Sequence, residues 1–409
     1  MNYSNAFSKE NTEALDLKGL YEKYKAYLFT DYLPFLERYV YDQEYGGYFW
    51  NTSYAGQRLS SSKRTWYDAR GAWVYCNLYM HLDANPTYLL RAKQTLDLLD
   101  RAKDPNQAYW PWSYSQQGSN LGERDGDIYG NLFVAEAFAA YAEATGELNY
   151  WERAKEIVLG AFANYQKADY RYQLEYSPEA SFTEAEEVLG HYMIFLHLCT
   201  AMLRYKEDLD LQELKECCVK ALVDNHIYPE QGLMPEIRTK SGQPLPEGIS
   251  QFICLGHAIE ALWMLMDEAQ RTGDVELFQL AALRFKHHLE VAWDRVYGGV
   301  FHFLDHLDAC KFFTDKVLWA QQEAMIGCLI LIEAWDDQWA KDWFAKLALY
   351  VNTHFIRHDL PYKPWKLNGD RKMNQLTEGF RIENYHHPRF LAFSLLSMDR
   401  ILNKQIKTI

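Results

Sequence analysis

No apolar run in the 409-residue sequence approaches the roughly 20 residues that span a bilayer. The first 19 residues are polar and acidic, and they lack the apolar core of a secretory signal. Basic runs are also absent, and 42 Lys and Arg against 56 Asp and Glu give a formal net charge of −14. Nucleic-acid grooves and anionic membrane surfaces need clustered cations. We therefore expect a soluble, cytoplasmic protein that binds neither nucleic acid nor membranes.

Cysteine is sparse, and its number, seven, is odd. The one adjacent pair, Cys217–Cys218, lacks metal-ligand spacing, and four other cysteines lie in apolar helical patterns, which suits a reduced compartment. The chain also lacks His-Glu-x-x-His, a phosphate-binding loop and Gly-x-Ser-x-Gly. We therefore expect neither a bound metal nor a redox cofactor.

Aromatic residues, in contrast, are abundant, with 13 Trp, 30 Tyr and 21 Phe making up 16% of the chain. Aromatic rings pack on the apolar faces of pyranoses, so this composition suits a sugar-binding protein. A bulky helical core would explain the same numbers, and composition leaves both interpretations open.

Apolar residues recur at helical spacing along the whole chain, and no alternating strand pattern of comparable length competes. The predicted helices cover residues 10–38, 66–83, 87–103, 127–145, 148–167, 185–204, 210–227, 252–271, 275–293, 316–334, 337–357 and 387–403. We find no linker or low-complexity stretch and predict a single domain over residues 1–409.

Short and long connections alternate between these helices. The long ones cover residues 41–65, 104–126, 228–250, 294–315 and 357–384. Loops above about 15 residues are uncommon in compact domains unless they carry function. The alternation predicts an all-α fold, an (α/α)₆ barrel of six helical hairpins, with short β-hairpins in the long loops at the mouth of the active site.

An internal repeat supports the barrel. The segment Asp42-Gln-Glu-Tyr-Gly-Gly-Tyr-Phe49 recurs as Asp294-Arg-Val-Tyr-Gly-Gly-Val-Phe301. Downstream, Trp66-x-x-x-Arg70 corresponds to Trp319-x-x-x-Glu323. A spacing of four places the charge and the indole on one helix face. The two copies of the repeat therefore share the start of a helix but differ in the charged residue that follows the tryptophan.

Arg70 shares a helix face with Trp66, Trp73 and Asn77. An arginine there can hold a sugar hydroxyl or stabilise a developing oxyanion. A structural ion pair with Glu323 across the barrel is the alternative, and the two interpretations are compatible.

Two histidines lie at predicted helix starts near the mouth. His257 follows a glycine and precedes Glu260 by one turn, and the positive end of the helix dipole should keep its imidazole neutral. His386 and His387 precede Pro388, which suits a first helical turn. Two imidazoles facing one cavity are what a two-base proton transfer needs. Burial of His257 in the core and simple capping by the His-His pair are the alternatives.

Glycoside hydrolysis is an alternative chemistry for such a barrel, and it requires two carboxylates at the mouth. The candidates are Asp125, Asp127, Glu236, Glu260 and Glu323.

At these residues the chain resembles the N-acylglucosamine 2-epimerase superfamily, which includes cellobiose 2-epimerases and mannose epimerases or isomerases. The resemblance covers nearly the whole length and rests on six motifs in order. They are Asp42-x-x-Tyr-Gly-Gly-x-Phe49, Trp66-x-x-x-Arg70, Leu255-Gly-His257-x-x-Glu260-x-x-Trp263, Trp293-Asp-x-x-Tyr-Gly-Gly-Val-Phe301, Trp319-x-x-x-Glu323-Ala-Met and Tyr385-His386-x-Pro-Arg389.

The resemblance implies the (α/α)₆ barrel, an acid–base pair formed by His257 and His386, and no cofactor. The substrate-binding residues it implies are Arg70, Glu260, Trp319, Glu323, Tyr67, His197 and Arg389. Possible homodimers follow from family habit alone. The loop before His386 departs from the family pattern, reading Leu-Thr-Glu-Gly-Phe-Arg-Ile-Glu-Asn384.

We therefore expect a sugar 2-epimerase that acts on a gluco/manno-type aldose, N-acetylated or not, or on a disaccharide. Aldose–ketose isomerisation through the same enediolate is one alternative. A glycoside hydrolase and a non-catalytic sugar-binding barrel are the others.

Overall fold

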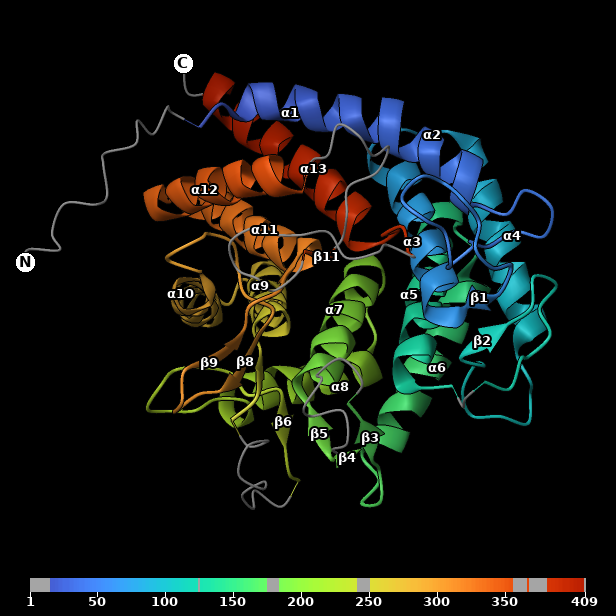
Figure 1. The fold of residues 1–409 in the computed structure, drawn as a ribbon. Coiled ribbons are helices and arrows are strands. Elements are labelled where there is room, and N and C mark those ends of the chain that lie inside the picture. The colour runs from blue at the N-terminus through green and yellow to red at the C-terminus, as the bar shows by residue number, and fades with distance from the viewer. Residues whose placement is uncertain are drawn as a thin grey trace, which may run out of the picture.

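The computed structural model describes residues 15–123, 126–174, 184–240, 251–355, 366–367 and 381–407. Six helices form a closed inner ring in which each contacts the next and the last contacts the first (Figure 1). They are α3 (Thr65–His81), α5 (Ile128–Thr145), α7 (Leu189–Tyr205), α9 (Leu255–Thr272), α11 (Leu318–Trp335) and α13 (His386–Lys407).

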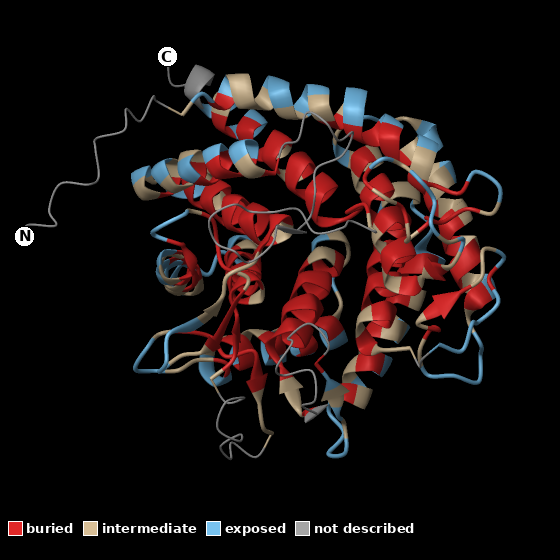
Figure 2. Ribbon diagram, in the orientation of Figure 1, coloured by how far each residue is buried: buried red, intermediate tan, exposed pale blue. Residues whose placement is uncertain are grey.

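An outer layer of helices covers this ring. It consists of α1 (Leu17–Ala26) with η1 (Tyr27–Tyr32), α2 (Leu33–Phe35) and η2 (Leu36–Val40), then α4 (Pro86–Ala102), α6 (Leu148–Tyr165), α8 (Leu209–Lys220) with η4 (Ala221–Asn225), α10 (Val275–Ala292) and α12 (Gln338–His354). Burial is concentrated in the inner ring (Figure 2). The (α/α)₆ barrel is confirmed. None of the helices in the described part of the chain combines the length and the apolar content of a membrane span.

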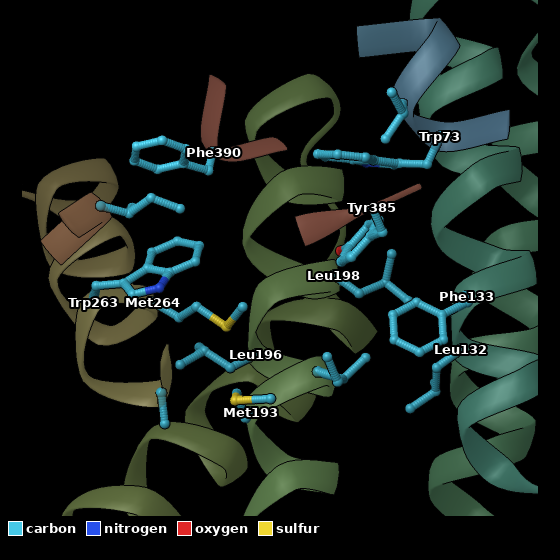
Figure 3. Close-up of a cluster of buried hydrophobic side chains, with 14 of the residues drawn as sticks. Trp73, Leu132, Phe133, Met193, Leu196, Leu198, Trp263, Met264, Tyr385 and Phe390 are labelled. Atoms are coloured by element: carbon cyan, nitrogen blue, oxygen red, sulfur yellow. The ribbon is translucent and has the colours of Figure 1, made fainter. Parts of the chain in front are cut away.

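Apolar and aromatic side chains of the inner helices pack together in the hydrophobic core. Figure 3 shows Trp73, Phe133, Trp263 and Tyr385 in this cluster. The ring of Tyr385 lies 5.1 Å from Trp73 and 5.6 Å from Phe133, between centroids. Some of the many aromatic residues therefore belong to the hydrophobic core.

Short strands lie where the inner helices begin, and most of them pair between successive connections. These pairs are β1 (Lys63–Arg64) with β2 (Ser113–Tyr114), β5 (Glu187–Val188) with β6 (Ile237–Arg238), β7 (Ile253–Cys254) with β8 (Phe303–His306) and β10 (Lys316–Val317) with β11 (Lys366–Leu367). Two more pairs form within one connection, β3 (Tyr172–Gln173) with β4 (Glu184–Ala185) and β8 with β9 (Lys311–Phe313). The prediction of hairpins inside the loops is therefore only part of the arrangement, because the strands also tie the mouth loops to one another.

These strands shift the starts of two predicted helices. The helix expected over 185–204 begins at Leu189 and the one over 252–271 begins at Leu255, because β5 and β7 precede them. The connection between α6 and α7, residues 166–188, is consequently also long. The first helix, expected from residue 10, begins at Leu17 within the described residues.

The inner and outer helices begin differently. Five outer helices have an Asn or Asp side chain that accepts a backbone N–H of the first turn, namely Asp16, Asn85, Asp208, Asp274 and Asp337. Helices α3, α7, α9 and α11 follow strands directly and have no side-chain cap. Uncapped N-termini carry partial positive charge. Four of the six inner helices, α3, α7, α9 and α11, therefore present electropositive ends at the mouth of the barrel, whereas carboxylates cap the starts of α5 and α13.

The internal repeat is built around two matching buried ion pairs. Nζ of Lys63 lies 2.8 Å from the Asp42 carboxylate, and Nζ of Lys316 lies 3.0 Å from that of Asp294. All four side chains are almost completely buried. The two lysines are 253 residues apart, as are Trp66 and Trp319, so the same offset identifies them in the sequence. Each pair anchors a Gly-Gly turn to the strand that precedes an inner helix.

Candidate active site

His386 is the first residue of α13, and a carboxylate fixes its ring. Nδ1 lies 2.9 Å from Oε1 of Glu323, which can only accept, and 3.2 Å from a terminal nitrogen of Arg389, which can only donate. The shorter contact, to Glu323, favours a hydrogen on Nδ1 and a lone pair on Nε2. Burial disfavours the charged imidazolium and lowers the pKa of His386 to about 3, although the nearby Glu260 opposes this. The imidazole is therefore neutral at pH 7.

Arg389 lies one turn further along α13 and joins two carboxylates. One of its terminal nitrogens donates to Glu260 at 2.6 Å and to Glu323 at 2.7 Å. Trp263 Nε1 donates to the other oxygen of Glu323 at 2.8 Å. Glu323 therefore pairs with Arg389, and the expected alternative of a Glu323–Arg70 ion pair is wrong because a nearer arginine takes its place.

His257 lies in the first turn of α9, where Glu236 from the preceding connection is its partner. Nδ1 of His257 donates to Oε1 of Glu236 over 3.0 Å. Burial lowers the pKa of His257, but Cys254 and the Glu236 carboxylate outweigh it and raise the pKa well above its usual value. The expectation that the helix dipole keeps this imidazole neutral is wrong, because a carboxylate in direct contact affects the pKa more strongly than the helix dipole does.

Trp319, the second residue of α11, lies against both imidazoles. Its ring centroid is 5.7 Å from that of His257 and 5.3 Å from that of His386. Space for the indole depends on Gly256, where a Cβ would lie 2.2 Å from a ring atom of Trp319. The three side chains come from three successive inner helices and form one group at the mouth.

Arg70 on α3 is surrounded by aromatic rings. Its Cζ lies 3.8 Å from the ring centroid of Phe133, 4.7 Å from Tyr385 and 5.1 Å from Trp66. Burial lowers its pKa. Its Nε is buried without a hydrogen-bond partner, and within the described residues no carboxylate lies at ion-pair distance. This guanidinium therefore has capacity for an anionic group from a ligand.

His197 on α7 belongs to a deeper hydrogen-bond network. Its Nε2 lies 3.3 Å from Oε1 of Glu136, which also accepts from the Tyr385 hydroxyl at 2.8 Å. Arg389 donates to the same hydroxyl at 3.2 Å. This connects His197 to the His386 cluster through buried polar groups.

With this geometry in place, comparison with known proteins decides the family. The sequence profile described as N-acylglucosamine 2-epimerase (GlcNAc 2-epimerase) matches residues 46–387. The chain belongs to the N-acylglucosamine 2-epimerase family. The predicted resemblance is thereby confirmed, and as a member of this family the protein is an isomerase, a carbohydrate 2-epimerase.

Individual relatives agree with this assignment. The N-acylglucosamine 2-epimerase of Rattus norvegicus is 26% identical over 392 residues, which cover 91% of this chain and 90% of the relative. The cellobiose 2-epimerase of Bacillus thermoamylovorans B4167 superposes with a TM-score of 0.79 at 18% identity, covering 92% of this chain and 99% of the other. A D-mannose isomerase gives a TM-score of 0.72 at 16% identity, with 95% and 97% covered. At such identities the two structures show the shared fold.

Two candidates from the sequence lie away from this group. Tyr67 is buried, and its hydroxyl donates to the carbonyl of Ile382 at 2.6 Å, which ties α3 to the segment before α13. His387 contacts Gln322, 2.6 Å from its Nδ1, and packs against Tyr27 of η1. Of the adjacent histidines, only His386 reaches Trp319 and Glu323.

The carboxylates considered for hydrolysis divide into different roles. Asp127 accepts the N–H of Gly130 and caps α5, and Asp125 lies outside the described residues. Glu260 and Glu323 share one arginine, and Glu236 is the partner of His257. Each of these carboxylates among the described residues therefore already has a hydrogen-bond or ion-pair partner.

Glu383 is a site residue that the sequence patterns did not indicate. Its Oε1 accepts the backbone N–H groups of Tyr385 and His386, both at 3.0 Å, and so fixes the start of α13. A carboxylate three residues before His386, at the predicted start of a helix, is the signal that would have found it.

A cavity among the described residues lies toward the C-terminal ends of the inner helices, opposite the mouth. It has a volume of about 560 Å³ and extends from Glu136, His197 and Trp263 to Arg204 in the last turn of α7 and to Arg400 of α13. Neither His257 nor His386 lines it. The two imidazoles lie on the mouth side of the buried polar network, and this cavity lies behind it.

Proposed function

We propose that this epimerase inverts C2 of a gluco/manno-type aldose through an enediolate, with His386 and His257 as its two acid–base groups. The observation that carries the proposal is that two imidazoles contact one indole while their environments shift their pKa values in opposite directions. Groups whose pKa values are driven apart are suited to separate acid and base roles.

In the resting state His386 is the base. Its Nδ1–H is held by Glu323, so the lone pair of Nε2 is available to take the C2 proton of an open-chain sugar. His257, protonated beside Glu236, returns a proton to the opposite face. The reverse reaction begins from the alternate distribution of protons, as microscopic reversibility requires. Proton delivery to C1 in place of C2 gives a ketose, so isomerisation is a side reaction of the same intermediate.

Arg70 is assigned to the enediolate oxygen. A guanidinium with an unpartnered buried Nε and no carboxylate nearby among the described residues is arranged to stabilise negative charge that develops during the reaction. The uncapped N-termini of the inner helices add to this positive potential.

The other polar groups of the site have supporting roles. Arg389 holds Glu260 and Glu323 together, and Glu323 in turn orients His386. Trp319 offers an indole that is only partly buried between the two imidazoles, which suits stacking against a sugar. His197 and Glu136 lie deeper in the barrel than this group and belong to the buried hydrogen-bond network described above.

The proposal is tested by proton NMR in D₂O with N-acetylmannosamine, N-acetylglucosamine, mannose, glucose and cellobiose in separate incubations. Deuterium at C2 of the newly formed epimer is expected for one of these pairs, and the sugar that responds identifies the substrate class. Release of a monosaccharide from cellobiose would indicate a hydrolase. Saturable sugar binding without exchange at C2 would indicate a binding barrel.

A further inference from the structure

Three different metal-binding groups meet beside α9. A ligand atom each from Glu236, Cys254 and His257 lies within 4.8 Å of the others. Cys254 is the last residue of β7, His257 lies in the first turn of α9, and Glu236 directly precedes β6. The thiol of Cys254 lies beside His257, and Nδ1 of His257 contacts Glu236 at 3.0 Å. The strand pairing of the mouth therefore assembles a sulfur, a nitrogen and an oxygen donor.

Gly190, the second residue of α7, lets the backbone of that helix pack closely against this trio. A Cβ at Gly190 would lie 3.1 Å from Nδ1 of His257 and 3.2 Å from Oε1 of Glu236. It would also lie 2.4 Å from the hydroxyl of Tyr129, which is buried and has no hydrogen-bond partner. The hydroxyl of Tyr129 therefore lies close to the trio, and an unpaired buried hydroxyl is unfavourable unless a ligand or water reaches it.

The donor set favours zinc among common metal ions. Three protein ligands of the thiolate, imidazole and carboxylate types with one further position open are typical of a non-structural zinc site. Soft sulfur with imidazole selects against magnesium and calcium. A second group of three, formed by Glu260, Glu323 and His386, is equally compact, but the guanidinium of Arg389 already occupies its centre and repels a cation.

We propose that Glu236, Cys254 and His257 bind a zinc ion that switches the epimerase off. Binding displaces the thiol proton of Cys254 and the proton shared by His257 and Glu236 into solvent, and no electrons are transferred. His257 then binds the metal ion and no longer carries the proton that it would transfer to the sugar. The inhibitory part of this inference rests on the proposed function, whereas the binding part does not.

The binding experiment uses the full chain, freed of metal with a chelator, and titrates it with zinc chloride by calorimetry and equilibrium dialysis. One zinc per chain is expected. Cys254→Ala should weaken binding by about 100-fold or more, since even outer-shell changes cost 10- to 100-fold. Cys217→Ser and Cys310→Ser are the controls, because these two cysteines are exposed and lie elsewhere. Cobalt as a replacement ion should give a thiolate charge-transfer band that Cys254→Ala abolishes.

Unchanged zinc affinity in Cys254→Ala, or its loss in either control, would overturn the site. In the activity experiment, zinc should inhibit turnover of the responding sugar and chelator should restore it, whereas the activity that Cys254→Ala retains should resist zinc. Zinc bound at the trio without an effect on turnover would overturn the inhibitory role. One zinc lost specifically with Cys254 supports the site even if none of the sugars reacts, so the two proposals fail separately.

Discussion

Oε1 of Glu236 accepts a hydrogen bond from Nδ1 of His257 over 3.0 Å, between a loop that follows η4 and the first turn of α9. Burial alone would lower the pKa of His257. Cys254 and this contact with Glu236 together raise it above its usual value. His386 has the opposite shift, to a pKa of about 3, with burial as the main cause. Near pH 7 the resting enzyme accordingly carries one charged and one neutral imidazole.

The pH profile should depend on Glu236. Because the pKa of His257 is raised, this histidine keeps its proton until the pH passes that raised value, so kcat/KM falls on the alkaline side. Glu236→Gln removes the negative charge and should move this limb about one pH unit or more toward acid. Glu230→Gln, an exposed position in the same connection, is the control. An alkaline limb that stays in place in Glu236→Gln would contradict the assignment.

Gly256→Ala should impair the site through Trp319. The added Cβ would lie 2.2 Å from the indole, which must move away from the two imidazoles. Overpacking of this kind costs about 1–3 kcal/mol, so we expect kcat/KM to fall about 10-fold or more, together with a change in tryptophan fluorescence. Gly160→Ala on α6, where a Cβ meets nothing within 4 Å, should leave kcat/KM unchanged. Equal activity of the two variants would exclude a role for the position of Trp319.

Arg70→Gln should lower kcat more than it raises KM, since the guanidinium is assigned to charge that develops only in the reaction. Loss of one oxyanion donor costs about 10²- to 10³-fold in kcat. Arg153→Gln on the outer helix α6, where the arginine pairs with Asp100, controls for loss of a positive charge. A purely raised KM in steady-state kinetics would assign Arg70 to substrate binding alone.

Lys316→Met should destabilise the fold by about 3–5 kcal/mol, because it leaves the Asp294 carboxylate buried without its cation. Lys63→Met should have a similar effect in the other copy of the repeat. Urea denaturation followed by circular dichroism measures the change. The double variant Lys316→Met/Asp294→Asn should recover part of the loss, and a double variant less stable than Lys316→Met would contradict the ion-pair explanation.

The fold was accessible from the sequence because helical periodicity is a local signal that repeats in every hairpin. The alternation of short and long connections then placed the mouth, and the repeat around Asp42 and Asp294 indicated equivalent helix starts. The pairing of β1, β5, β7 and β10 with neighbouring loops was not accessible, since two-residue strands carry no periodic pattern.

Part of the site could also be predicted from the sequence, because helix starts could be. His257, Trp319 and His386 lie at helix starts, so barrel symmetry alone brings them to one end. The partners of these residues depend on which loops meet in space. The sequence could not choose between Arg70 and Arg389 for Glu323, nor show that Glu236, distant in the chain, would reach His257.

The most direct test of the two-base mechanism measures hydrogen exchange at C2 in D₂O for each epimer separately, in His386→Asn and His257→Asn. Each variant should lower turnover about 100-fold or more. Each should also lose exchange from one epimer while keeping it from the other, because the remaining imidazole still faces one side of the substrate. Exchange that is lost equally from both epimers in one variant and unaffected in the other would show a single base and contradict the account.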